Sequence, residues 1–150
     1  STSTTTKPII VTPKPSTPST GGAVDFPYVD LAVRVIATGV LDKNNGVFTP
    51  TPSVYANERV AIRFEVINMG TKVSGTWNFS AVLPSTPQNI YFSPEQAPLN
   101  AGDRIEFTLG FDNIRDVPVG LITLNVDPSN LVNERTKTNN VATVGVVIRK

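Results

Sequence analysis

The 150-residue sequence contains no cysteine and no histidine. Without cysteine, a disulfide scaffold, a thiolate nucleophile and a cysteine-based zinc site are all excluded. Without histidine, the commonest general base and metal ligand of enzymes is missing. A hydrolase would then need paired carboxylates facing one cleft, whereas the acidic residues are scattered along expected strands and loop tips. We therefore expect a protein that is not an enzyme.

Charge and long apolar runs are also scarce. Charged residues make up 17% of the chain, against roughly 25% in ordinary soluble domains. Lysine and arginine number 13 and aspartate and glutamate 12, for a net charge of +1. The sequence shows no stripe of basic residues of the kind that contacts nucleic-acid phosphates. No apolar run approaches the ~20 residues that cross a bilayer. We expect neither a nucleic-acid partner nor direct membrane insertion.

The first part of the chain has the composition of a linker. Half of residues 1–22 are serine or threonine, with four prolines among them. Such a segment buries too little apolar surface to offset its ordering entropy, so residues 1–25 are predicted to be a disordered Ser/Thr/Pro-rich linker. Ile9-Ile10-Val11 is its one apolar patch, suited to adding to a sheet edge. Stalks of this kind belong mainly to exported proteins. Because the chain opens with STSTTT and not with a signal segment, export implies a mature region or a fragment.

From residue 26 onward the hydrophobic pattern has a period of two. Strict alternation means that one face of each strand is buried and the other is wet, as in antiparallel sheets. We predict an all-β, immunoglobulin-like antiparallel β-sandwich of about seven strands over residues 26–150, with Trp77 at the centre of its core. The clearest strands are expected at residues 31–36, 60–67, 76–83, 104–111, 119–126 and 141–148.

Short motifs at the expected strand ends carry a family resemblance. They are Asp30-Leu31-Ala32-Val33, Val66-Ile67-Asn68-Met69-Gly70, Leu99-Asn100-Ala101-Gly102, Val126-Asp127-Pro128-Ser129-Asn130, Glu134 and Asn139-Asn140. In this order they resemble the CARDB family, the "cell adhesion related domain found in bacteria", over roughly residues 30–148. The resemblance implies an immunoglobulin-like sandwich on exported, often multidomain proteins of bacteria and archaea.

Each motif also has a physical interpretation. Asn68 and Gly70 suit a positive φ between adjacent strands, and Gly102 serves the turn before the next strand. Asp127 is expected to open its loop as an Asx or type I turn. Asn139 and the residue after it offer donors and acceptors for loop backbone groups that would otherwise be buried without partners. The loop is therefore predicted to be a structural staple.

The alternative for this loop is a cation site. Asp127, Asn130, Glu134 and Asn139 offer hard oxygen ligands of the kind that Ca²⁺ accepts. Lys137 brings positive charge into the same stretch and weakens that alternative. We expect no cofactor, with Ca²⁺ as the only candidate ion. The loop at residues 42–46 has an acid and amides too, but its spacing does not fit an EF-hand, so it is predicted to be a turn.

The two outer faces of the sandwich are predicted to differ in charge. In an immunoglobulin-like strand order the first, second and fourth major strands share a sheet whose outer face carries Arg34, Arg63, Glu65, Arg104 and Glu106, which can form ion pairs. The opposite sheet would expose an almost uncharged set, and interfaces are poor in charge at their centre. We hypothesise that it docks a neighbouring domain, another copy or a polysaccharide, against the alternative of a merely wet polar sheet. Its candidate partner-binding residues are Asn78, Ser80, Thr123 and Asn125.

Aromatic residues in two proline-rich loops add a second kind of candidate. Tyr91, Phe92, Phe48 and Tyr55 either cover the open end of the sandwich or stack on sugar. We predict a non-catalytic extracellular or cell-surface module that acts as a spacer, adhesion or assembly domain of a larger exported protein or filament. The alternative is a carbohydrate-binding module accessory to a secreted enzyme. The sequence leaves the oligomeric state open.

Overall fold

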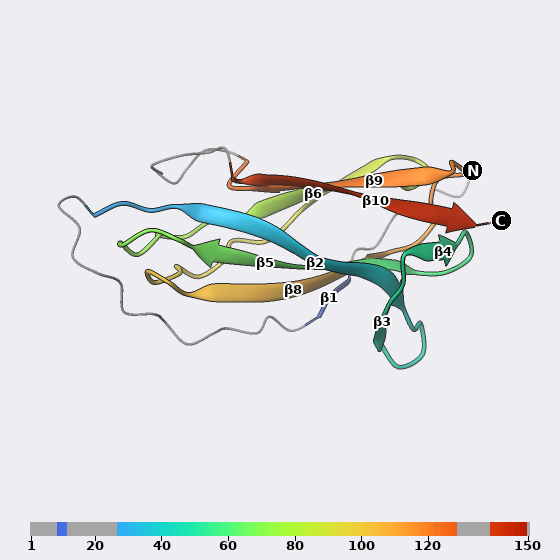
Figure 1. Cartoon of the computed structure of the whole chain (residues 1–150), viewed down its shortest axis with the longest axis horizontal. Helices are drawn as coiled ribbons and strands as arrows, with labels where there is room; N and C mark the ends of the chain where they lie inside the picture. Colours follow the sequence, from blue (N-terminus) through green and yellow to red (C-terminus); the bar gives the residue numbers. More distant parts are fainter. Residues whose placement is uncertain (1–8, 12–26, 129–138, 150) are drawn as a thin grey trace.

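The chain folds as two layers of β-sheet in a computed structural model that describes residues 9–11, 27–128 and 139–149 (Figure 1). One five-stranded sheet has the order β1-β8-β5-β2-β3 and the other has the order β4-β10-β9-β6-β7. The strands are β1 (Ile9–Val11), β2 (Leu31–Leu41), β3 (Phe48–Pro50), β4 (Ser53–Tyr55), β5 (Val60–Asn68), β6 (Phe79–Leu83), β7 (Asn89–Phe92), β8 (Arg104–Phe111), β9 (Val119–Val126) and β10 (Val141–Arg149).

The predicted fold class is confirmed, with a few additions. All six clearly expected strands are present, and Ile9–Val11 pairs with the edge of β8 as its apolar composition suggested. The short strands β3, β4 and β7 were not expected. The chain changes sheets between β3 and β4, and β4 then pairs with β10 in parallel, so the sandwich is not purely antiparallel. The described residues form no helix of the length and apolar character needed to span a membrane.

The core between the sheets is centred on aromatic rings. The ring centroid of Phe79, from β6, lies 5.2 Å from that of Phe64 and 4.9 Å from that of Phe107, which belong to the opposite sheet. Trp77 packs edge-on against Phe107 at 6.3 Å, and its indole N–H donates to the carbonyl of Ala97 at 3.0 Å. All four rings are fully buried. The predicted central place of Trp77 is therefore confirmed, with Phe79 as the ring that joins the two layers.

Asn68 and Gly70 hold the end of β5 by a different means from the one expected. Neither residue has a positive φ, so that prediction was wrong. The fully buried Asn68 amide donates to the carbonyls of Lys72 at 2.7 Å and Leu99 at 3.0 Å and accepts from the Gly70 N–H at 3.0 Å. A Cβ on Gly70 would lie 2.2 Å from the carbonyl oxygen of Tyr28. Glycine is needed here for close backbone approach, and Asn68 is needed for its hydrogen bonds.

The turn before β8 does follow the expectation. Gly102 has a φ of 82°, a conformation that costs glycine nothing and other residues a steric penalty. Its N–H donates to the Asn68 carbonyl at 2.8 Å, and the Asn68 N–H donates to the carbonyl of Asp103 at 2.9 Å. The turn therefore joins the same polar cluster.

Removing the central ring should cost much of the stability. Phe79→Ala is expected to lower the free energy of unfolding by about 3–5 kcal/mol, because it leaves a cavity between the two sheets. Phe92→Ala is the matched control, since Phe92 is 62% exposed on the neighbouring strand, and it should change stability by only about 0.5 kcal/mol. Urea denaturation followed by Trp77 fluorescence measures both. Equal losses for the two variants would contradict this placement of the core.

Candidate binding surfaces

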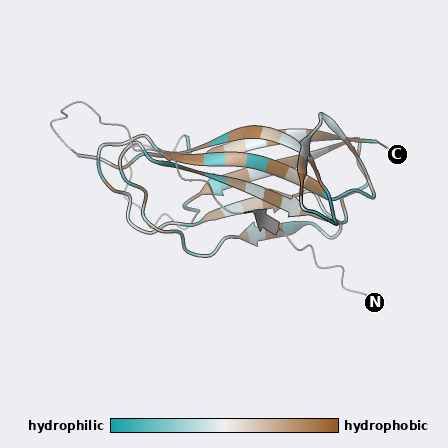
Figure 2. Cartoon of the chain, turned by 90° about the horizontal axis from the view of Figure 1, so that it is seen from below, coloured by the Kyte–Doolittle hydropathy of each residue, from teal (hydrophilic) through white to brown (hydrophobic). Residues whose placement is uncertain are grey.

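The outer face of the β8-β5-β2 sheet is charged and internally paired. Glu65, almost fully buried, forms ion pairs with Arg34 on β2 and with Arg104 on β8, the latter at 3.5 Å. Arg63 approaches Glu106 at 3.6 Å. Hydrophilic and hydrophobic residues alternate along the strands on this side (Figure 2). The predicted cross-strand ion pairs are confirmed, but Glu65, which was expected to be exposed, is buried between its arginine partners.

Phe48 belongs to this charged face. The Arg63 guanidinium carbon lies 4.5 Å from the centroid of the Phe48 ring, within the range of a cation–π contact. The Arg63 Nε also donates to the Thr108 hydroxyl at 3.2 Å. Because Arg63 already covers its ring, Phe48 is a poor candidate for stacking on a sugar.

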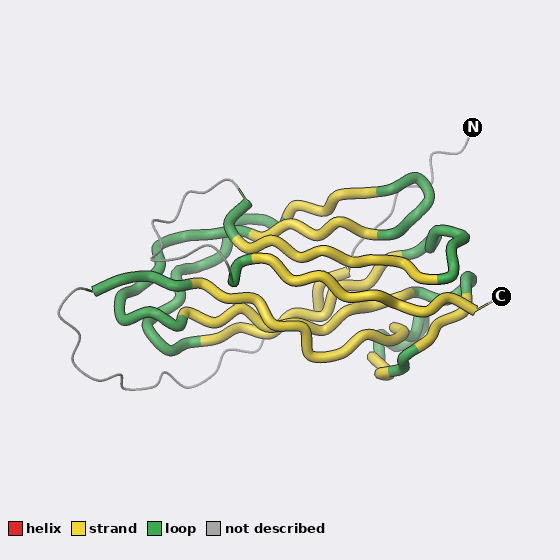
Figure 3. The backbone as a smooth tube through the Cα atoms, turned by 45° about the horizontal axis from the view of Figure 1, so that its top comes forward, coloured by secondary structure: helices red, strands yellow, loops and turns green. Residues whose placement is uncertain are grey.

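The outer face of the other sheet is uncharged over most of its area. β9 and β10 run side by side in this sheet (Figure 3), with Leu121 opposite Gly145 and Thr123 opposite Thr143. We call its outward positions the neutral face, and the charged Arg149 lies beside it at the end of β10. The neutral face consists of Ser53, Tyr55, Ser80, Val82, Ile90, Phe92, Val119, Leu121, Thr123, Asn125, Val141, Thr143, Gly145 and Val147.

Large apolar side chains are exposed together on the neutral face. About half of each is accessible to solvent in Ile90, Phe92, Val119, Leu121, Val141 and Val147. The sequence-based prediction recognised the lack of charge but missed most of this apolar character. Ile90 lies on a strand that was not predicted, and Val119 and Val141 are the first residues of theirs. The period-two parity that Val119 shares with Leu121 was the signal available in the sequence.

Of the predicted partner-binding residues, Thr123 and Asn125 are partly exposed on the neutral face. Ser80 lies between Asn125 and Phe92 in register but is buried. Its expected exposure was wrong, because a small side chain between two larger ones is covered by them. Asn78 precedes β6, and its carbonyl accepts from the Asp127 N–H at 2.7 Å.

Tyr91 and Phe92 point to opposite sides of β7. Tyr91 faces the core, where its ring centroid lies 6.1 Å from that of Phe79 and burial raises the pKa of its hydroxyl. Phe92 points outward. The two rings therefore cannot form one stacking platform. Of the four candidate aromatics, Phe92 and Tyr55 remain exposed, on opposite edge strands of the neutral face.

Polar residues around the β9–β10 connection join neighbouring segments through hydrogen bonds. Asp127 is buried with a φ of 55°. The Asn139 side-chain amide donates to the Asp30 carboxylate at 2.8 Å, and the backbone carbonyl of Asn139 accepts from the Val33 N–H at 3.1 Å. The Asn140 amide donates to the Val126 carbonyl at 3.2 Å. The Asn140 amide bonds a backbone carbonyl as predicted, whereas the Asn139 amide bonds a carboxylate, and the backbone carbonyl of Asn139 connects the start of β10 to the opposite sheet.

Two residues of the candidate cation site, Asn130 and Glu134, lie outside the described residues. The buried Oδ1 atoms of Asn139 and Asn78 accept no hydrogen bond from the described part of the chain. Within the described ranges, no group of three or more acidic, histidine or cysteine side chains could hold a metal ion.

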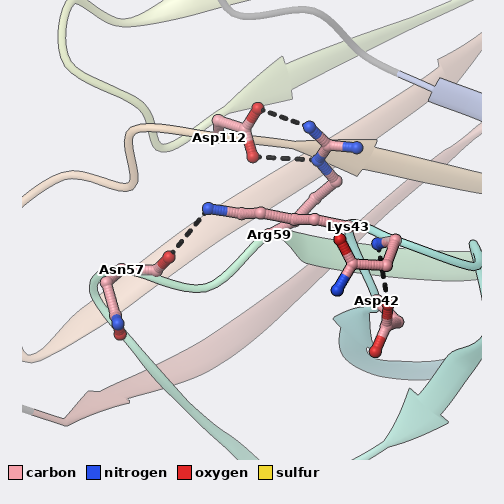
Figure 4. Close-up of polar contacts among 6 residues, drawn as sticks. Asp42, Lys43, Asn57, Arg59 and Asp112 are labelled. Carbon is pink, nitrogen blue, oxygen red and sulfur yellow. Dashed lines mark hydrogen bonds and ion pairs between the residues drawn. The ribbon is translucent and has the colours of Figure 1, made fainter.

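A polar pocket of about 390 Å³ lies at the end of the sandwich where β2 leads into β3 (Figure 4). Asp42 accepts from the N–H groups of Asn45 at 3.0 Å and Asn44 at 2.7 Å. These bonds lower the pKa of the Asp42 carboxyl, and the bond from Asn45 has the larger effect. Arg59 donates to both oxygens of Asp112, at 2.9 and 3.0 Å, which raises the pKa of the guanidinium.

These contacts explain the pocket as part of the fold. Lys43 Nζ also donates to the Asn57 carbonyl at 3.1 Å, so the principal charged groups of the pocket already have partners within the chain. The predicted turn at residues 42–46 is confirmed. The neutral face, whose apolar side chains have no such partners, is the stronger candidate for binding.

Comparison with known proteins agrees with this fold. The crystal structure of the CARDB domain of the PF1109 protein from Pyrococcus furiosus, in complex with di-metal ions, superposes with a TM-score of 0.60 at 18% identity, over 83% of this chain and 97% of that one. The solution structure of the same domain gives a TM-score of 0.60 at 18% identity, over 82% of this chain and 97% of that one. A search of curated proteins gives no match. The CARDB sequence profile matches residues 40–144, and the chain therefore belongs to the CARDB family.

Proposed function

We propose that this chain is a non-catalytic cell-surface module that holds a larger exported protein or filament together by docking a neighbour on its neutral face. One observation carries the proposal. Six large apolar side chains, each about half exposed, lie on the outer side of one sheet, with Val119, Leu121 and Val147 adjacent in register, whereas the outer side of the other sheet carries ion pairs. Contiguous exposed apolar patches mark interaction sites, and interface centres are poor in charge.

The surroundings of the domain support a place outside the cell. The Ser/Thr/Pro-rich composition of residues 1–25 is typical of stalks in exported proteins. The absence of cysteine and histidine leaves few groups for catalysis. A sandwich that follows a Ser/Thr/Pro-rich segment suits spacing or adhesion better than chemistry.

Charging the neutral face should weaken docking. Leu121→Lys is expected to weaken binding of the fluorescently labelled chain to isolated cell envelopes of the source organism by roughly tenfold or more, because a buried unpaired charge is costly. Met69→Lys is the matched control, since Met69 and Leu121 are both 58% exposed but Met69 lies in a loop away from the neutral face. Equal binding by wild type, Leu121→Lys and Met69→Lys would overturn the proposal.

The second candidate, carbohydrate binding, rests on Phe92 and Tyr55. Both rings are exposed, at 62% and 49%, but they lie on β7 and β4, at opposite edges of the sheet. Each would have to stack on a sugar alone, without a second ring. We therefore expect no binding on an array of bacterial and plant polysaccharides. Binding that Phe92→Ala or Tyr55→Ala removes, and that Phe48→Ala leaves intact, would replace assembly by carbohydrate recognition.

Calcium is proposed to play no part in closing the β9–β10 connection. The relative from Pyrococcus furiosus binds di-metal ions, and the unpaired amide oxygens of Asn78 and Asn139 are the one local observation that favours a cation. The described carboxylates, however, are only those of Asp127 and Asp30, and Asp30 already accepts from the Asn139 amide. This donor set does not fit a divalent cation well.

The melting temperature should therefore not depend on calcium. Thermal melts of the whole chain in excess Ca²⁺ and in excess EGTA are expected to agree within about 1 °C, because a ligand stabilises only the state that binds it. Asp127→Asn serves as the control. A Ca²⁺-dependent rise that this variant loses would reassign the loop as a metal site.

A further inference from the structure

We propose that the occupant of the neutral face is the neutral face of a second copy of this chain. The two copies would be related by a two-fold axis that runs along the strands between β9 and β10. This inference rests on the proposed function and deepens it, because it names the partner. The observations that carry it are the relief of the face, the pairing of its central threonines and its lack of charge.

The face has a ridge, formed by Val119 and Leu121 on β9, beside a lower step at Gly145 on β10. Gly145 lies opposite Leu121 in register and has no side chain. A Cβ placed on Gly145 would lie 3.0 Å from a methyl carbon of Val119 and 3.6 Å from one of Leu121. The ridge therefore borders the step directly. A second ridge can pack against the exposed backbone of Gly145.

A two-fold axis between β9 and β10 brings each ridge over the other copy's step. Such an axis exchanges the two strands and keeps the level of every residue. Leu121 would face the partner's Gly145, and Val119 would face the partner's Val147, its own register neighbour on β10. Each strand would run in the same direction as the same strand of the other copy, apart from the angle of about 30° that sheet twist imposes on aligned packing.

Two threonines at the centre of this face are already paired within one copy. The hydroxyl oxygens of Thr123 and Thr143, which face each other in register, are 3.1 Å apart and share a hydrogen bond. Burying these two hydroxyls therefore leaves fewer donors and acceptors without a hydrogen bond than burying unpaired groups would. The centre of the face can be covered without a polar partner, which favours an apolar occupant over a polysaccharide.

Charge also favours a second copy. Docking two neutral faces desolvates no ion pair, whereas docking against the charged face would remove Glu65 and its arginine partners from water. Arg149 lies at one end of the neutral face, where it can remain at the rim. Of the two outer sheet faces, the neutral face is therefore the one that can cover another neutral face without desolvating ion pairs.

The size of the face sets the strength of the dimer. Across the proposed axis β9 lies over the partner's β10, whereas β4 and β6 carry two outward residues each at different levels and do not meet. Two strands at about 4.8 Å and four outward levels at about 6.8 Å give roughly 260 Å² per copy. A pair would bury roughly 500 Å², below the usual size of specific interfaces, so we expect a weak, reversible dimer that forms only toward millimolar concentration.

Sedimentation velocity of the whole chain between about 10 μM and about 1 mM tests this, since weak interfaces associate in that range. Wild type and Met69→Lys should pass from monomer to dimer, whereas Leu121→Lys should stay monomeric. Near-ultraviolet circular dichroism of Trp77 verifies that each variant is folded. Wild type that is monomeric at every concentration would overturn the inference.

A charge pair tests the proposed axis. Gly145→Glu alone should also be monomeric, because it places a carboxylate against the partner's Leu121. In the double variant Leu121→Lys/Gly145→Glu, each lysine faces the partner's residue 145, so dimerisation should return and weaken with salt. A double variant that stays monomeric would overturn the axis.

The failure of this inference can be told apart from the failure of the proposed function. If wild type is monomeric and Leu121→Lys still weakens envelope binding, the neutral face docks a different partner and only the second copy is excluded. If Leu121→Lys changes neither self-association nor envelope binding, both are wrong.

Discussion

The contact between the inner faces of the two sheets is the constraint on which the rest of the molecule depends. Phe79 meets Phe64 and Phe107 from the opposite layer, and once these rings are inside, strand alternation decides the position of every neighbour. Glu65 follows Phe64 and therefore faces outward among arginines. The same parity in the other sheet turns Leu121 and Thr123 outward. Because the core needs only alternate residues, the two outer faces are free to differ, and they differ in charge.

Buried amides complete what the aromatic core begins. Asn68 gathers the backbone at the end of β5, and Asn139 connects the start of β10 to Asp30 and Val33 in the opposite sheet. Each of these bonds satisfies a backbone or side-chain group that would otherwise be buried without a partner. The polar motifs that carry the family resemblance therefore have an internal role in this chain. The candidate binding surface therefore lies away from the residues that carry the family resemblance.

Period-two alternation was enough to predict the six long strands, the position of Trp77 and the ion pairs of the charged face, because these depend on residues within one strand and its neighbours. It was not enough for the short strands β3, β4 and β7, since three or four residues hold too little pattern. The burial of Ser80 and the close approach at Gly70 depend on segments distant in sequence. The opposite orientations of Tyr91 and Phe92 follow from alternation, but only once residues 89–92 are known to form a strand.

The edges of the sheets explain why association is expected on a face. Sheet edges offer unpaired backbone groups and are a common route to pairing between chains. Here the four edge strands, β1, β3, β4 and β7, are only three or four residues long, so each can add few backbone hydrogen bonds to another chain. The charged face holds its own ion pairs and gains little from leaving water. The neutral face is the remaining surface on which association buries apolar area without separating charges, and its ridge and step allow that area to be covered by a copy of itself.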